Sequence, residues 1–111
     1  MQILDRKLNV VVVAGASGIG REVATAYQHQ GSKVFVCDIS DDLIGSFQKN
    51  FPHIFIEKAD VSIYNDVADF FNKIKQEEES IDVLINCAGI AGPTASLEDI
   101  DPDDWDQTIR V

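Results

Sequence analysis

The chain has 111 residues, of which 45% are hydrophobic and 25% are charged. These fractions are ordinary for one soluble globular domain, and they exclude a disordered chain. The formal net charge of −10 would repel the phosphate backbone of a nucleic acid, so we exclude that class of partner.

Neither a membrane anchor nor an export signal is visible in the sequence. No apolar run reaches the roughly 18 residues that cross a bilayer, and residues 1–8 lack the apolar core of a secretory signal. We therefore expect a cytoplasmic protein without a membrane partner.

The cysteines, histidines and clustered acids do not predict a metal site. Cys37 and Cys87 are too few for a secreted disulfide scaffold, and their spacing from His29 and His53 does not fit metal ligation. Helix capping and a solvated helix face explain the acids between residues 98 and 106. We expect reduced thiols and no metal.

The first part of the chain combines a strand, a glycine-rich turn and a helix. Residues 10–13 are β-branched and uninterrupted, which predicts a strand covered on both faces. The glycine-rich residues 14–20 then lead into a helix from about Ile19, and Gly31 supplies its C-terminal stop. The residues expected to share one face of this helix are Ile19, Val23, Ala26 and Tyr27.

The middle of the chain repeats this alternation of strand and helix. A second strand is expected over residues 33–37. Ser40 is placed to cap a short helix, which must finish before Phe51 because Pro52 follows. A third strand is expected over residues 54–56.

The last part of the chain holds the clearest helical pattern. Ser62 is expected to cap a third helix, in which Val67, Phe70, Phe71 and Ile74 keep helical spacing. A fourth strand follows over residues 83–85. Asp101 and Pro102 are a capping acid and a first-turn proline, so a fourth helix should start there.

This order of elements predicts the class of fold. Strands that alternate with helices form a parallel sheet covered on both faces, which is a doubly wound α/β fold in three layers. A crossover helix that starts near residue 102 should return a fifth strand, and none follows. We therefore expect residues 1–111 to be one partial domain with an incomplete sheet.

The glycine-rich turn has the context of a phosphate-binding loop. Gly15, Gly18 and Gly20 follow a buried strand and open a helix. Glycines let the backbone approach a diphosphate closely, while the free N–H groups and the dipole at a helix start favour its negative charge. Glycines also close ordinary turns between strand and helix, so this motif alone is weak.

Asp38 strengthens the prediction of a dinucleotide site. It stands at the end of the second strand, about 20 residues after the glycines, where an acid binds the ribose hydroxyls of NAD. The alternative is a plain turn residue. The same carboxylate would repel a 2′-phosphate, and neither residues 15–20 nor residues 39–41 contain Lys or Arg. We therefore favour NAD over NADP as the cofactor.

Three motifs in this order resemble the short-chain dehydrogenase/reductase family and its Rossmann-like fold. They are Gly18-Ile19-Gly20, Asp60-Val61 after the third strand, and Asn86-Cys87-Ala88-Gly89 after the fourth. The resemblance implies that the Asp-Val pair holds the adenine and that the last motif braces the sheet beside the cofactor. The expected cofactor-binding residues are Gly15, Ser17, Gly18, Ile19, Gly20, Asp38, Asp60, Val61, Asn86, Ala88 and Gly89.

Two positions depart from the family pattern. An ungapped comparison puts Val13 and Ala14 at the family's Thr-Gly pair, whereas matching Gly15 to the first glycine makes the loop one residue short. The second Asn of the bracing turn is Cys87, which has only a weak hydrogen-bond donor. Asn86 is therefore the better candidate for the bracing role.

The resemblance also implies a catalytic Tyr-x-x-x-Lys pair, which this sequence lacks. Gly31 and Ala68 stand where the lysine would follow Tyr27 and Tyr64. The family's supporting Asn of the fourth helix would come directly after Val111. We name no catalytic residue and expect the chain to be the cofactor-binding half of a longer, homo-oligomeric enzyme that acts on a small alcohol or carbonyl compound.

Other interpretations remain open at this stage. The chain could be a non-catalytic NAD-binding or regulatory module, or an inactive truncated product. A fold like that of response regulators is disfavoured, because glycines follow the first strand where an acidic pair is needed. If the family's strand order 3-2-1-4 holds, Cys37 and Cys87 lie roughly 10 Å apart, beyond the roughly 7 Å limit for a disulfide.

Overall fold

The computed structural model describes residues 7–111, so the prediction about a secretory signal at residues 1–8 lies largely outside the described residues. All the predicted strands and helices are present, and their bounds differ from the expected ones by a few residues. The elements are β1 (Asn9–Val13), α1 (Gly18–His29), β2 (Lys33–Asp38), α2 (Asp41–Asn50), β3 (Phe55–Lys58), α3 (Tyr64–Glu77), β4 (Val83–Asn86), the short 3₁₀ helix η1 (Leu97–Asp99) and α4 (Pro102–Arg110).

The four strands form one parallel sheet in the order β3-β2-β1-β4. The β-branched strand β1 is central, as its sequence predicted, and Val10, Val11 and Val12 are fully buried. β1 also lies between the strands that carry Cys37 and precede Cys87, and both thiols are free. The predicted doubly wound α/β fold is confirmed.

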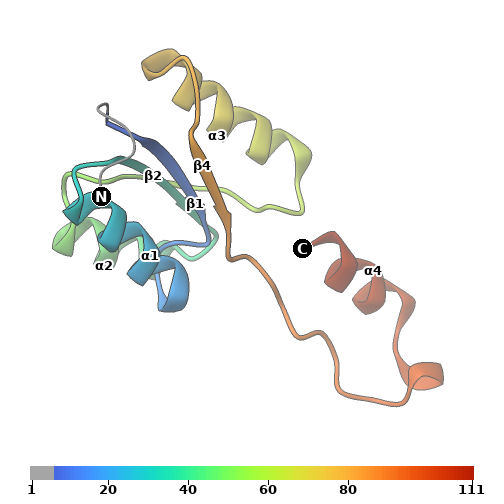
Figure 1. Cartoon of the computed structure of the whole chain (residues 1–111). Coiled ribbons are helices and arrows are strands. Elements are labelled where there is room, and N and C mark those ends of the chain that lie inside the picture. Colours follow the sequence, from blue (N-terminus) through green and yellow to red (C-terminus); the bar gives the residue numbers. More distant parts are fainter. Residues whose placement is uncertain (1–6) are drawn as a thin grey trace.

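Helices cover both faces of the sheet (Figure 1), which makes three layers. On one face, Ala24 of α1 and Phe47 of α2 pack with Val10 and Val12 in one core cluster. On the other face, Phe70 and Ile74 of α3 pack against the opposite side of the same strands, around Val11 and Phe35. Successive side chains of β1 point to opposite faces, so both clusters share this strand.

The packed face of α1 differs from the predicted one. Gly20 and Ala24 are buried, with Val23 and Tyr27 partly buried against the core cluster. Ile19 is 79% exposed, and Ala26 is exposed as well. The prediction for these two residues was wrong because the buried stripe begins at the small residue Gly20, which lets the helix approach the loop before it.

The sequence predicted a capping residue for the helix on each side of β3, and one of these two predictions was wrong. The hydroxyl of Ser40 accepts a hydrogen bond from Leu43 N at 3.3 Å and caps α2 as expected. The cap position of α3 is Ile63, which has no side-chain acceptor, and not Ser62. The Ser62 hydroxyl instead donates to the Asp60 carboxylate, because the turn curls back on itself before the helix starts.

α4 lies apart from the three layers at the end of a long extended connection (Figure 1). Its predicted start is confirmed, because the Asp101 side chain accepts from Asp103 N at 2.8 Å and Pro102 occupies the first helical position. The apolar side chains of Trp105 and Ile109 are exposed, as is Leu84 on β4. The sheet edge at β4 and this helix thus present apolar surface.

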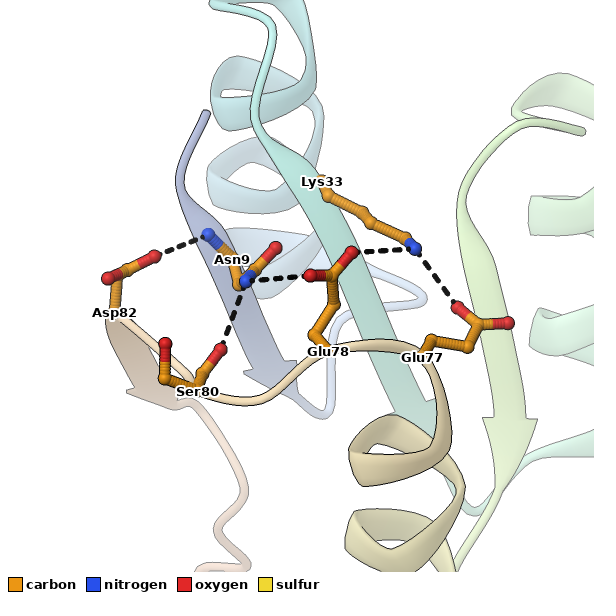
Figure 2. A network of polar contacts seen from close by, with 6 residues as sticks. All are labelled: Asn9, Lys33, Glu77, Glu78, Ser80 and Asp82. Atoms are coloured by element: carbon orange, nitrogen blue, oxygen red, sulfur yellow. Dashed lines mark hydrogen bonds and ion pairs between the residues drawn. The ribbon is translucent and has the colours of Figure 1, made fainter. Parts of the chain in front are cut away.

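A network of polar contacts ties the amino ends of the strands together (Figure 2). Asn9 N donates to Asp82 Oδ2 at 2.8 Å, and Asn9 Nδ2 donates to Glu78 Oε2 at 3.3 Å. Lys33 Nζ lies 3.0 Å from Glu78 Oε1. This contact lowers the pKa of the Glu78 carboxyl and raises the pKa of the Lys33 amine. The network holds β1, β2 and the α3–β4 connection together at the amino ends of the strands. The predicted site lies at the opposite end, where the strands finish.

None of the helices between residues 7 and 111 combines the length and the apolar character that crossing a bilayer requires.

Candidate cofactor-binding site

The loop between β1 and α1 is held against the end of β2. Ala14 N and Gly15 N both donate to the carbonyl oxygen of Cys37, at 2.8 and 3.3 Å. The residue of this loop with a left-handed backbone is Ala14, with a φ of 61°. Ala14 is the residue that the ungapped comparison aligns with the family's glycine, and Gly15 does not need the left-handed region.

Gly15 and Gly20 are required by close packing. A Cβ atom at Gly15 would lie 2.7 Å from Val36 Cγ1, and a Cβ at Gly20 would lie 2.3 Å from the carbonyl oxygen of Ala14. Both glycines therefore bring the loop and α1 close to the sheet, and neither faces open space. Gly15 was predicted to bind the cofactor, and the structure packs it closely against Val36 and Val12 of the sheet.

Among the described residues, the start of α1 has backbone N–H groups without a hydrogen-bond partner. Ser17 occupies the cap position, but its side chain makes no capping bond, and the first N–H of the helix to find a carbonyl partner is that of Arg21. Within residues 7–111, the N–H groups of residues 17–20 have no hydrogen-bond partner. Gly18 has a φ of +56° with nothing within 4 Å of a Cβ there. This arrangement fits an anion.

Asp38 links the end of β2 to this loop. The residue is 8% exposed, and its Oδ2 accepts from Ala16 N at 3.1 Å. Its Oδ1 accepts from Ile39 N and Ser40 N, at 2.8 and 3.2 Å. Three backbone donors therefore fix the direction of the carboxylate. A carboxylate has about four lone-pair sites, so it can accept further hydrogen bonds from a ligand.

Asp60 is oriented in a similar way after β3. Its Oδ1 accepts from Ser62 N at 2.9 Å and from the Ser62 hydroxyl at 2.6 Å. The Ser62 hydroxyl is the main reason why the pKa of the Asp60 carboxyl lies below its usual range. Asp60 N in turn donates to Asp66 Oδ2 at 2.9 Å. The side chain is thus ionised and held in one direction.

A cavity of about 200 Å³ brings these elements together at the carboxyl ends of the strands. Five of the predicted residues line it, namely Asp38, Asp60, Val61, Ala88 and Gly89. The glycine-rich residues 15–20 are not among the residues that line it, whereas Ala14 is. Asn86 is exposed on β4 and outside the cavity wall. No Lys or Arg is among the lining residues that the structure describes.

Several residues of the cavity wall were missed by the sequence reasoning. They are Ala14, Cys37, Ile39, Ala59, Ile90, Gln107 and Val111. Most of them directly precede or follow a predicted residue at a strand end, which is the signal that could have found them. Cys37 is buried there, and burial raises the pKa of its thiol to about 11. It is therefore a neutral wall residue.

The two tyrosines lie away from this cavity. Tyr27 is partly buried on α1 against the core cluster, and Tyr64 is exposed at the start of α3. Neither is among the residues that line the cavity. Within residues 7–111, no group of His, Cys, Asp and Glu side chains is arranged to hold a metal ion.

Known proteins share this fold. The chain resembles the crystal structure of an actinorhodin polyketide ketoreductase variant with NADPH, with a TM-score of 0.86 and 22% identity. The match covers 95% of this chain and 41% of that one. At this identity the likeness shows the fold.

Sequence comparison shows the family. The family model described as short chain dehydrogenase matches residues 8–111. The chain is 31% identical over 117 residues to short-chain dehydrogenase reductase 5 of Arabidopsis thaliana, covering 99% of this chain and 43% of that protein. It is 35% identical over 102 residues to dehydrogenase/reductase SDR family member 6 of Rattus norvegicus, covering 92% and 39%. The chain spans about two fifths of the length of these relatives, and it belongs to the short-chain dehydrogenase/reductase family.

Proposed function

We propose that the full-length protein is an NAD-linked oxidoreductase that transfers hydride between the cofactor and a small alcohol or ketone, and that this chain supplies the dinucleotide site. The observation that carries the proposal is the start of α1, where, in the described part of the chain, the N–H groups of residues 17–20 have no hydrogen-bond partner and Gly18 faces open space. A helix start of this kind binds a diphosphate without any cationic side chain.

Each part of the dinucleotide has a matching group. The N–H groups from Ser17 to Gly20 hold the diphosphate, with Ile19 exposed beside it. Asp38 accepts hydrogen bonds from the adenosine ribose hydroxyls. Asp60 and Val61 line the part of the cavity assigned to adenine. Ala88 and Gly89 flank the cofactor where β4 ends, Asn86 braces that turn, and Gly15 packs the loop closely against the sheet.

The charges around the cavity favour NAD over NADP. A 2′-phosphate would lie beside the Asp38 carboxylate, and like charges at short range repel. Two basic side chains, one at the start of α1 and one at the end of β3, have contacts of their own. The Arg21 guanidinium lies 5.2 Å from the centre of the Phe51 ring, and Lys58 Nζ lies 2.9 Å from Asp41 Oδ2.

The role of this chain in the reaction is to bind and to orient. The nicotinamide of a bound dinucleotide supplies or accepts the hydride. Tyr27 and Tyr64 do not line the cavity, so neither is assigned the proton transfer. A cytoplasmic location, a single domain that includes residues 1–111 and a homo-oligomeric assembly complete the proposal, on the basis of composition and family.

Titration of the full-length protein with NADH and with NADPH tests the cofactor assignment. Fluorescence of the reduced nicotinamide reports binding, and we expect NADH to bind at least about tenfold more tightly, which is about 1.4 kcal/mol. Asp38→Ala should reduce this preference by removing the repulsion. Tighter binding of NADPH would contradict the assignment of Asp38, and failure to bind either dinucleotide would refute the proposed function.

Turnover distinguishes an enzyme from a protein that only senses NAD. Absorbance of NADH should change when the full-length protein is mixed with the cofactor and a panel of small alcohols and ketones. Binding of NADH without turnover of any compound in a broad panel would instead favour a regulatory NAD-binding protein.

A further inference from the structure

β3 forms one edge of the sheet, and one side of its backbone faces away from the other strands. Ala59 N donates to the carbonyl oxygen of Asp38 at 3.0 Å, so by the alternation of a parallel ladder residues 55, 57 and 59 face β2. The N–H and carbonyl groups of Ile56 and Lys58 therefore point outward, where the sheet has no further strand within residues 7–111. An edge of this kind can pair with an added strand.

A polar groove of about 410 Å³ lies beside this edge. Its wall comes from Glu57 and Lys58 of β3 and from one stripe of polar side chains along α3. The residues of this stripe are Asp66, Asp69, Asn72, Lys73 and Gln76. Because α3 covers one face of the sheet, a strand added to β3 would direct every second side chain toward that face and its polar stripe.

Both lysines in the wall of the groove are paired with acids of this chain. Lys58 Nζ lies 2.9 Å from Asp41 Oδ2. Lys73 Nζ contacts the Glu57 carboxylate across the groove. The positive charges are thus compensated, and neither lysine is left to attract an acidic partner.

Two acids of the α3 stripe keep an uncompensated negative charge. Asp66 Oδ2 accepts from Asp60 N at 2.9 Å, and this neutral donor leaves the charge in place. Asp69 is exposed and, in the part of the chain that the structure describes, it has no hydrogen bond or ion pair. The net charge of −10 attracts positively charged partners over longer distances. The groove therefore favours a basic occupant.

We propose that the β3 edge and its groove are a docking site for a short extended peptide segment of a partner protein, with lysine or arginine at alternate positions. The outward groups of Ile56 and Lys58 pair with the backbone of the segment, and Asp66 and Asp69 attract its basic side chains. A short edge strand that carries charges resists indiscriminate pairing, which leaves charge to select the partner. This site does not depend on the proposed function.

Binding of labelled peptides to the full-length protein tests the site. The probes are two fluorescein-labelled peptides, one of four Lys-Val repeats and one of four Glu-Val repeats, and fluorescence anisotropy reports binding. The basic peptide should bind at least about tenfold more tightly than the acidic one. Asp69→Lys should weaken binding of the basic peptide about threefold to tenfold. Glu22→Lys makes the same change of charge on α1, over the other face of the sheet, and should have a smaller effect.

A matched pair of variants separates strand addition from general attraction between charges. Lys58→Pro removes the outward N–H, which makes no bond to β2, whereas Lys58→Ala removes the same charge and keeps the N–H. Lys58→Pro should bind the basic peptide at least about tenfold more weakly than Lys58→Ala. If Lys58→Pro does not fold, a basic peptide that is N-methylated at its central residues makes the same comparison on the wild-type protein. It should bind at least about tenfold more weakly than the unmethylated peptide.

Each other outcome contradicts the proposal. Equal binding by Lys58→Pro and Lys58→Ala, or of the methylated and unmethylated peptides, would show that charge alone explains the binding. Failure to bind the basic peptide, or equal binding of the acidic one, would overturn the site as well. Analytical ultracentrifugation tests a second copy as the occupant, and a dimer that Lys58→Pro dissociates would overturn the peptide site. A wild-type protein that binds the basic peptide but neither NADH nor NADPH would refute the proposed function alone.

Discussion

The two glycines on either side of Ile19 should respond very differently to substitution by alanine. A Cβ at Gly20 would lie 2.3 Å from the carbonyl oxygen of Ala14 and 2.9 Å from the Cα of Gly15, which are backbone atoms that cannot rotate away. A Cβ at Gly18 would meet nothing within 4 Å, and only its φ of +56° opposes the substitution. The loop should therefore tolerate alanine at Gly18 better than at Gly20.

The expected changes in the free energy of unfolding follow from these contacts. Gly20→Ala overpacks a tight site and should cost about 3 kcal/mol. Gly18→Ala places an L-residue in the left-handed region and should cost about 1 to 2 kcal/mol. Gly45 lies inside α2 with nothing within 4 Å of an added Cβ. Gly45→Ala is therefore the matched control, and it should stabilise by about 1 kcal/mol through helix propensity.

Urea unfolding of the full-length protein, followed by far-ultraviolet circular dichroism, measures these differences. The midpoints should fall in the order Gly45→Ala, wild type, Gly18→Ala, Gly20→Ala. NADH affinity should drop in both loop variants and stay unchanged in Gly45→Ala. If Gly20→Ala proved as stable as Gly18→Ala, the close approach of α1 to the loop would not constrain this position, and the reasoning would be refuted.

Three further predictions concern stability. Burial raises the pKa of the Cys37 thiol to about 11 in the folded protein, so as pH rises above about 9 this thiol ionises in the unfolded chain before it ionises in the folded one. Up to about 2 to 3 kcal/mol of stability should therefore be lost between pH 9 and 11. Cys37→Ala should flatten this pH profile of urea midpoints, and an unchanged profile would contradict the assignment. Phe70→Ala should cost about 3 to 5 kcal/mol in full-length protein, whereas Tyr64→Ala at an exposed site should change the midpoint by about 0.5 kcal/mol or less; similar costs would refute the packing of α3. The 111-residue chain alone, with Leu84 49% exposed at the sheet edge, should unfold in urea without a cooperative transition, and a sharp transition would show that this edge needs no cover.

The fold could be predicted from the sequence because its signals are local and agree with one another. The uninterrupted valines of β1 indicate a strand buried on both faces, and the alternation with helical periods indicates crossovers. Asp101 and Pro102 mark the start of α4 by their chemistry alone. The predicted strand order, which came from the family resemblance, fits the parallel pairing of β1 with β2 and β4.

The errors arose where a contact between distant segments overrides a local pattern. Ile19 fits the helical period of α1, but Gly20 approaches Ala14 and thereby turns Ile19 to the surface. Ser62 has the side chain of a capping residue, but Ile63 occupies the cap position, and the Ser62 hydroxyl donates to the Asp60 carboxylate. The sequence placed Asp38 and Asp60 at strand ends, but it could not show that Gln107, from a helix far along the chain, would share their cavity.

The left-handed backbone at Ala14 has a consequence for the thermodynamics of ligand capture. An alanine at a φ of 61° costs about 1 kcal/mol or more relative to glycine, so neighbouring contacts must impose this shape on the loop. The N–H groups of Ala14 and Gly15 supply them through the carbonyl oxygen of Cys37. A loop fixed in this way loses little conformational entropy when an anion arrives, and more of the interaction free energy appears as affinity.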